Sequence, residues 1–365
     1  MLRGRAKGFL ANIALAVAAD EAREPLGVVG VHPYLHEDAI AHQGMTPSQR
    51  VTATRAKARA ERELARWEQL ARTVSARLPN SVEALHVMDQ EADAYDLLAA
   101  LRQAQLHYVI RACPARQTTD AKLGVKAVLA RQADTFFRTV PLSPRGPRKA
   151  VKTRGRYPAR AGCLATLDVR CGTVTLPRRQ HSETTLRALT LQAVHVVEPA
   201  PPRGETAIEW MLFTPEPVQT FEDAAAVVDH CRARRLIEEY FNAPITGCAF
   251  EKRQLTSLPA LLRELALFIP MAWRLLVLRH PGRITPAQPV GDLVNQAQRL
   301  LLPKHLARRH YHLPPRPKMQ DIMLRVAALG GHIKNNRALG WLVLGRGLTR
   351  LLDTEVGRRL ARGDM

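Results

Sequence analysis

Residues 227–255 read VVDHCRARRLIEEYFNAPITGCAFEKRQL. The first half of this stretch is rich in charged residues and predicts a helix. At about 100° per residue, Cys231, Arg234 and Glu238 fall within roughly 60° of one another, so one face presents a guanidinium and a carboxylate together. Such a face is either a solvated helix surface or part of a functional site. Gly247 ends the run at a position typical of a helix C-cap.

A proline interrupts the second half of the same stretch. Pro244 lies where the helix would continue, and an interior proline destabilises a helix by roughly 3 kcal/mol. We therefore expect the charged face to stop at Ala243, which would leave Ile245 off that face.

These residues resemble the catalytic helix of bacterial cut-and-paste transposases, in the insertion-sequence branch called IS-four-like and typified by the transposon Tn-five. That family carries Tyr-x2-Arg-x3-Glu-x6-Lys at this place. Arg234 and Glu238 match the Arg and the Glu. The resemblance implies that Glu238 is the third acid of a catalytic Asp-Asp-Glu triad and that Arg234 contacts DNA phosphate. Cys231, Asn242 and Ile245 depart from the pattern, since the family has Tyr, a basic residue and Lys at these positions.

A second acidic motif follows the short apolar strand predicted at Ala84–Met88. Asp89 opens DQEADAYDLL, and the carboxyl end of a strand is where α/β sheets place their sites. Alternatively, Asp89 or Asp93 caps the helix that follows. The resemblance extends to this motif, because the family carries Asp-Arg-Glu-Ala-Asp here and its first Asp is the second acid of the triad. Asp89 is then a catalytic metal ligand, and Gln90 replaces the family's Arg.

The family's chemistry uses two Mg²⁺ ions, which carboxylate oxygens bind well. The resemblance therefore implies that Asp89 and Glu238 hold Mg²⁺ together with a first acid in a Gln-Asp-Thr-Thr-like motif. In the family that motif precedes the segment resembling Gly8–Val17. No Asp precedes Asp20 in this sequence, and Asp20 lies in the turn after that segment. We therefore expect an N-terminally truncated copy whose two-metal site is incomplete and whose catalysis is impaired.

Three further features suggest contact with DNA. Trp210 lies at the same spacing before Cys231 as the family tryptophan that stacks on a flipped base, although a core tryptophan would fit the sequence equally. Arg111 follows a predicted strand and matches a family position suited to DNA contact. The segment from Ser143 to Arg160 is either a solvated loop or a basic loop over a phosphate backbone. Its candidate DNA-binding residues are Lys149, Lys152 and Arg154.

Composition agrees with a polyanionic partner. The 365 residues include 54 Lys and Arg against 33 Asp and Glu, a formal net charge of +21, and 46% are hydrophobic. The basic surplus is spread along the chain, which fits a polyanionic partner better than a single charged tail. Charge alone does not separate nucleic acid, which we expect, from a ribosomal or membrane-surface role. The apolar run Leu265–Trp273 is bounded by Glu264 and Arg274 and is far shorter than a membrane span.

Cysteine usage and the N-terminal sequence bear on localisation. The five cysteines form no CxxC pair and predict free thiols in a reducing bacterial cytoplasm. The first 20 residues also resemble a signal peptide, but Asn12 interrupts the apolar run and we expect a strand there.

The order of predicted elements favours an α/β fold. Strands are predicted at Gly8–Val17, Pro25–Pro33, Ala84–Met88 and Leu106–Ile110, and helices at Thr46–Leu78 and from about Asp93. The resemblance implies an RNase H-like core without its first strand, a β-rich insertion and a helical C-terminal dimerisation region. The expected parts are residues 1–112 (partial core), 113–219 (insertion), 220–255 (return to the core with the catalytic Glu) and 256–365 (dimerisation helices).

By resemblance, the expected function is DNA transposition by a dimer that nicks transposon ends, forms a hairpin and joins the element to target DNA. The alternative is a non-enzymatic regulator that binds DNA or forms a mixed dimer with a full-length transposase and inhibits it. A third candidate is an RNase H-like nuclease that cleaves RNA–DNA hybrids.

Overall fold

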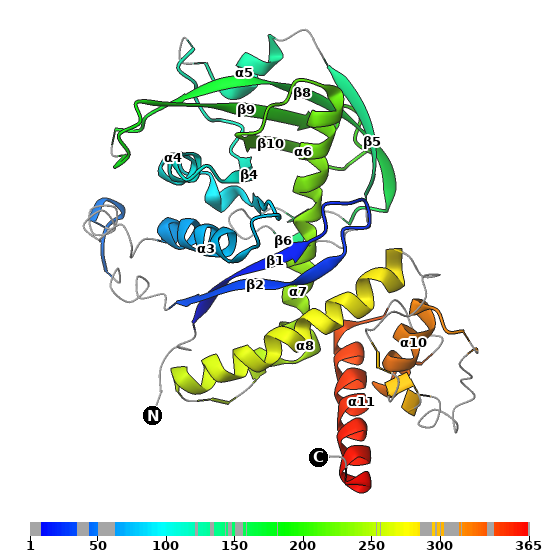
Figure 1. The fold of residues 1–365 in the computed structure, drawn as a ribbon. Coiled ribbons are helices and arrows are strands. Elements are labelled where there is room, and N and C mark those ends of the chain that lie inside the picture. The colour runs from blue at the N-terminus through cyan, green and yellow to red at the C-terminus, as the bar shows by residue number, and fades with distance from the viewer. Residues whose placement is uncertain are drawn as a thin grey trace. The chain divides into compact units, whose positions relative to one another are not determined.

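The computed structural model divides the chain into two compact units (Figure 1). The central unit is Gly44–Arg234, and the terminal unit combines Met1–Gln43 with Arg235–Met365. The structure describes residues 9–34, 44–49, 63–120, 123–131, 135–142, 144, 148–149, 156–157, 159–180, 182–252, 254–255, 257–284, 294–295, 298–299, 301–302, 314, 316–333 and 339–363.

A six-stranded mixed sheet forms the frame of the central unit. Its strand order is β3-β4-β10-β9-β8-β5. Only β3 and β4 pair in parallel, and the other neighbours are antiparallel. The strands are β3 (Leu85–Met88), β4 (His107–Ala112), β5 (Phe136–Leu142), β8 (Cys163–Pro177), β9 (Ala188–Val197) and β10 (Glu209–Thr214). The expected core and insertion regions therefore contribute strands to the same sheet.

Helices cover both faces of this sheet because its central strands alternate between two apolar cores. On β4, Tyr108 and Ile110 face one core with α3, α4 and α5, whereas Val109 faces the other with α6. A capping box between Thr220 and Asp223 fixes the start of α6. The helices are α3 (Glu63–Arg77), α4 (Tyr95–Gln103), α5 (Val125–Ala130) and α6 (Phe221–Ala233), with the 3-10 helix η2 (Gln90–Ala92) before α4.

The terminal unit joins a hairpin to a group of helices. Strands β1 (Leu10–Val17) and β2 (Pro25–Tyr34) pair antiparallel as a two-stranded sheet of their own. The Trp273 indole N–H donates to the Pro25 carbonyl at 3.0 Å, which fixes β2 against α8. The helical elements are α7 (Arg235–Asn242), η3 (Ala243–Gly247), η4 (Phe250–Lys252), α8 (Leu258–Ile284), α10 (Met319–Leu329) and α11 (Trp341–Arg362).

Glycines allow very close packing inside the terminal unit. A Cβ built on Gly347 of α11 would lie 1.8 Å from the Val326 carbonyl oxygen of α10, and one on Gly330 would lie 1.8 Å from that of Val343. A Cβ on Gly345 would lie 2.0 Å from the carbonyl oxygen of Gly247. Side chains at these positions would collide with backbone, so the α10–α11 crossing depends on glycine.

The predicted helix of the opening stretch is present but divided. α6 ends at Ala233, Arg234 forms a turn, and α7 begins at Arg235. The α-helix ends at Asn242, one residue before the expected stop, and continues as the π-helix η3. In η3, the Cys248 N–H donates to the Ala243 carbonyl at 2.8 Å, a wider turn that accommodates Pro244.

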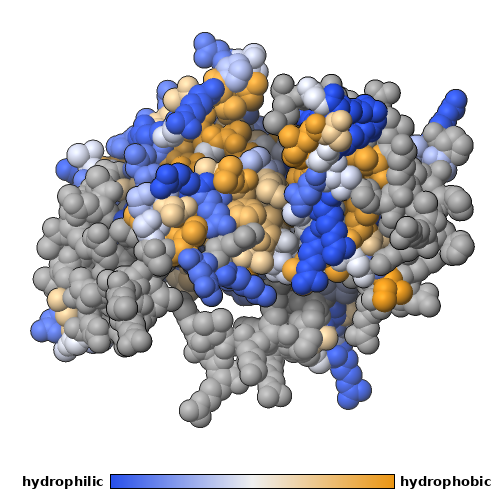
Figure 2. Space-filling view, turned by 90° about the horizontal axis from the view of Figure 1, so that it is seen from below, coloured by the Kyte–Doolittle hydropathy of each residue, from blue (hydrophilic) through white to orange (hydrophobic). Residues whose placement is uncertain are grey.

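The predicted strands at the two N-terminal segments, at Ala84–Met88 and at Leu106–Ile110 are confirmed within one or two residues. The first of them is the strand β1, as expected. The mixed α/β class is also confirmed, with C-terminal helices following the sheet. On the face shown in Figure 2, hydrophobic and hydrophilic residues are interspersed. In the described part of the chain, every helix is too short or too polar to cross a membrane.

Candidate functional site

Asp89 lies directly after β3 and caps the short helix η2. Its Oδ1 accepts the Glu91 N–H at 3.0 Å, and the Asp89 backbone is extended. The capping explanation is thus confirmed for Asp89, whose carboxylate also takes part in the cluster described next. The other predicted cap, Asp93, has a different and buried role.

Two arginines approach the carboxyl ends of the parallel strands β3 and β4. The register pairs Met88 with Ile110, so the next residues, Asp89 and Arg111, lie at the same edge of the sheet. Arg234, in the turn after α6, places its Nη1 3.6 Å from Asp89 Oδ2. Three predicted site residues therefore come together, although they lie far apart in sequence.

Cys231 of α6 completes this group, which we call the Asp89 cluster (Asp89, Arg111, Cys231 and Arg234). Burial raises the pKa of the Cys231 thiol, and the positive charges of Arg111 and Arg234 oppose that rise. The thiol is therefore neutral, and the cluster carries two guanidinium groups against one carboxylate. Among the described residues, the Arg111 side chain makes no hydrogen bond or ion pair, which leaves its donors available to a ligand.

The cluster suits an anion better than a divalent cation. One Asp89 oxygen accepts a backbone N–H and the other faces Arg234, so a cation here would compete with a guanidinium. Over the described ranges, no group of three or more His, Cys, Asp or Glu side chains could hold a metal ion. Asp89 alone does not constitute the expected two-ion site, and we derive no catalytic step through Mg²⁺.

Glu238 belongs to the terminal unit, whereas Asp89 belongs to the central unit. It lies on the first turn of α7 and is exposed. The predicted grouping of these two acids around metal therefore stays a prediction.

Trp210 occupies a structural position. It lies on β10 opposite Val196 and packs, partly buried, against the apolar core beneath α6. This supports the core explanation for Trp210, and stacking on a base stays a prediction.

The basic segment is described only in part. Lys149 lies in the short strand β6 (Arg148–Lys149), which pairs with β7 (Arg156–Tyr157). Lys152 and Arg154 lie outside the described residues.

Asp93 pairs with a residue that the sequence did not indicate. The Asp93 carboxylate lies 2.9 Å from Arg116 Nη2, and their side chains are only 5% and 7% exposed. The motif around Asp89 included Asp93, but no local pattern marked Arg116 as its partner. The ion pair of Arg160 with Glu198 was missed for the same reason.

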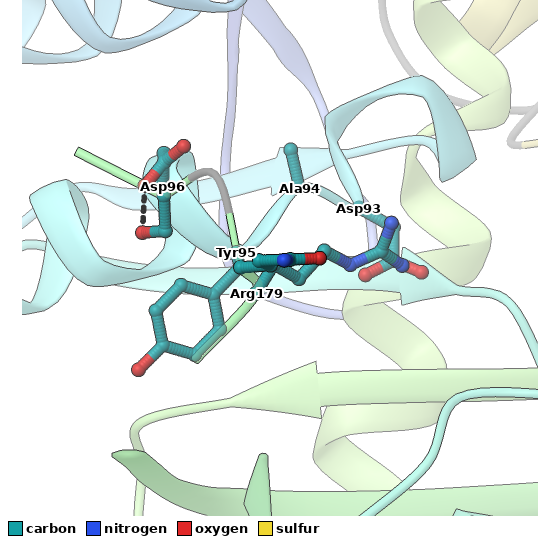
Figure 3. A pocket seen from close by; sticks show the side chains of 7 residues that line it. Asp93, Ala94, Tyr95, Asp96 and Arg179 are labelled. Atoms are coloured by element: carbon teal, nitrogen blue, oxygen red, sulfur yellow. Dashed lines mark hydrogen bonds between the residues drawn. The ribbon is translucent and has the colours of Figure 1, made fainter. Parts of the chain in front are cut away.

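A pocket of about 500 Å³ opens beside Asp93 at the start of α4. Figure 3 shows the Arg179 side chain extended toward Asp93, while the Ser182 hydroxyl donates to the Asp96 carboxylate. Since both acidic and basic side chains line this pocket, its charges largely compensate one another and we assign it no ligand. In a comparison with protein families, no family model matches the chain.

Proposed function

We propose that this chain is a DNA-binding protein of the cut-and-paste transposase type whose own cleavage activity is impaired. The observation that carries the proposal is the meeting of Arg111 and Arg234 beside Asp89 at the carboxyl ends of β3 and β4. The net charge of +21 supports a polyanionic partner. The sequence motifs around Asp89 and Glu238 support the family.

The two arginines would bind a phosphodiester group of DNA. A guanidinium presents paired N–H donors that match phosphate oxygens, and such charge-assisted bonds are among the strong ones. In the absence of DNA, Asp89 holds Arg234 in place by its ion pair. A phosphate would compete with Asp89 for Arg234 while binding Arg111, whose donors are available.

Impaired cleavage is proposed from the same residues. The Asp89 carboxylate is engaged by the Glu91 N–H and Arg234. Cys231 and Ile245 replace the family's Tyr and Lys. Cleavage with Mg²⁺ would show that Asp89 and Glu238 hold the metal that the family resemblance implies, and it would contradict the proposed impairment.

The test of DNA binding uses the double variant Arg111→Gln/Arg234→Gln. Its affinity for labelled duplex DNA, measured by fluorescence anisotropy, should fall by about ten-fold or more, and the slope of log affinity against log salt should become shallower by about 0.9 per lost phosphate contact. The control Arg187→Gln/Arg203→Gln removes the same charge from two exposed arginines of the same unit. An Arg111/Arg234 variant that binds like this control would contradict the proposal.

A second candidate function is inhibition of a full-length transposase through a mixed dimer. It is favoured by Val356 and Leu360, which lie one turn apart on α11 and are each 54% exposed. Exposed apolar side chains at this spacing suit packing against another helix.

Sedimentation or light scattering should show dimers that dissociate in Val356→Asp/Leu360→Asp, with an unchanged melting temperature. Co-purification of the wild-type chain with a full-length transposase would extend this result to the mixed dimer. A wild-type chain that stays monomeric at all concentrations and does not co-purify with a full-length transposase would exclude the candidate.

A further inference from the structure

The buried pair of Asp93 and Arg116 links the two turns next to the Asp89 cluster. Asp93 ends the short turn that Asp89 begins, since its backbone N–H donates to Gln90 at 3.2 Å. Arg116 lies in the turn that follows β4, where its N–H donates to the Cys113 carbonyl at 3.1 Å. Each residue thus belongs to one of the two chain segments that leave the parallel strands.

Asp93 binds the second turn through both carboxylate oxygens. Oδ2 accepts the Cys113 N–H at 2.9 Å, and Oδ1 lies 2.9 Å from Arg116 Nη2. Cys113 follows Arg111 by two residues, so this contact adjoins the predicted phosphate contact directly. Both side chains are more than nine-tenths buried, so dissolved salt screens their attraction only weakly.

We propose that Asp93 and Arg116 are positioning residues for the DNA phosphate site. They fasten the turn that carries Asp89 to the turn that follows Arg111, and so hold Asp89, Arg111 and Arg234 in one arrangement. This inference rests on the proposed DNA-binding function.

The stability of the core does not by itself explain why a charged pair is buried at this place. Removing two ions from water is unfavourable, and apolar residues of similar volume often give an equally stable core. Burial lowers the pKa of Arg116 and the nearby charge of Arg179 lowers it further, while Asp93 opposes both effects. What the pair adds is direction, because one Asp93 oxygen accepts the backbone N–H of Cys113 while the other forms an ion pair with Arg116, and together these contacts determine how the two turns lie relative to each other.

The test compares two variants that remove charge from a buried carboxylate facing a buried arginine. Asp93→Asn affects the proposed pair, and Glu198→Gln affects the pair with Arg160 elsewhere in the same unit. Asp93→Asn should bind duplex DNA about ten-fold more weakly, with a salt slope shallower by about one. Glu198→Gln should keep the wild-type affinity and slope.

Stoichiometric titration of each variant gives the active fraction, so that misfolded protein is not mistaken for weak binding. Equal effects of both variants, or a wild-type salt slope in Asp93→Asn, would overturn the proposal. If Asp93→Asn fails to fold, Asp93→Leu/Arg116→Met removes both charges at once. This double variant should fold and still show the shallower slope, and a wild-type slope would contradict the positioning role.

A double-mutant cycle tests whether Asp93 acts through the arginines. In the Arg111→Gln/Arg234→Gln background, Asp93→Asn should weaken binding no further, because the contacts that it positions are already absent. A further ten-fold loss in that background would show that Asp93 acts in another way and would overturn the inference.

Amide hydrogen exchange separates this inference from the proposed function. Asp93→Asn should accelerate exchange of the Glu91 and Cys113 amides, which donate to Asp89 and Asp93. Suppose that exchange is faster in Asp93→Asn but that Arg111→Gln/Arg234→Gln keeps the wild-type affinity for DNA. This result would support the fastening of the two turns and refute the proposed binding of DNA by the two arginines. Unchanged exchange at both amides would refute the fastening itself.

Discussion

At the scale of single residues, His107 connects three segments of the central unit. Its Nδ1 lies 2.6 Å from Glu216, after β10, and its Nε2 lies 2.7 Å from Glu83, before β3. A neutral imidazole carries one N–H, whereas the imidazolium carries two and can donate to both carboxylates. The hydrogen bond to Glu216 raises the pKa of His107 most, burial opposes the rise, and the charges of Glu216 and Glu83 add to it.

We predict that His107 makes the stability of the central unit depend on pH. Because the folded pKa is raised, the contribution of His107 is fully present below its ordinary pKa of about 6.5. It is then lost as pH rises through the folded value. His86, on the neighbouring strand, is half-buried, and burial and the charge of His107 lower its pKa.

Urea unfolding at about pH 6 and about pH 8 should show a larger loss of unfolding free energy in the wild type than in His107→Gln. The His107→Gln variant is the control, because all other titrating groups are the same in both proteins. A loss of equal size in both proteins would contradict the prediction.

At the scale of elements, the α10–α11 crossing depends on the absence of side chains. Gly347→Ala would place a methyl group 1.8 Å from a backbone oxygen, which the helices can relieve only by moving apart. Overpacking of this kind destabilises by about 1–3 kcal/mol, and a clash with backbone belongs at the upper end of that range. We expect this loss in chemical denaturation of Gly347→Ala.

The same helix offers a control substitution whose expected change in stability has the opposite sign. Gly357 also lies within α11, but a Cβ there meets nothing within 4 Å. Gly357→Ala should stabilise the helix by about 0.5–1 kcal/mol, because alanine loses less conformational entropy than glycine in a helix. Equal effects of the two substitutions would show that the crossing is not tight.

At the scale of the whole molecule, the expected catalytic acids belong to different units. Asp89 lies in the central unit and Glu238 in the terminal unit. We predict no turnover of transposon-end or nonspecific DNA with Mg²⁺ or Mn²⁺. Gel assays that detect cleavage abolished by Glu238→Ala would refute the proposed impairment and establish an active transposase.

The sequence alone determined the local elements of this protein. Alternating and apolar runs predicted the strands at Ala84–Met88 and Leu106–Ile110, and the capping chemistry of Asp89 was among the stated alternatives. These features depend on neighbours within a few residues, so periodicity and turn chemistry are enough to find them. The basic composition likewise pointed to a polyanion without any structure.

Only the tertiary structure decided which of these residues meet. It joined β4 to β10, brought Arg234 to Asp89 and paired Asp93 with Arg116. It also divided the predicted helix at Arg234, where no glycine or proline marks a break. Such contacts join residues far apart in sequence, and a buried ion pair leaves no local pattern because each partner alone resembles a surface charge.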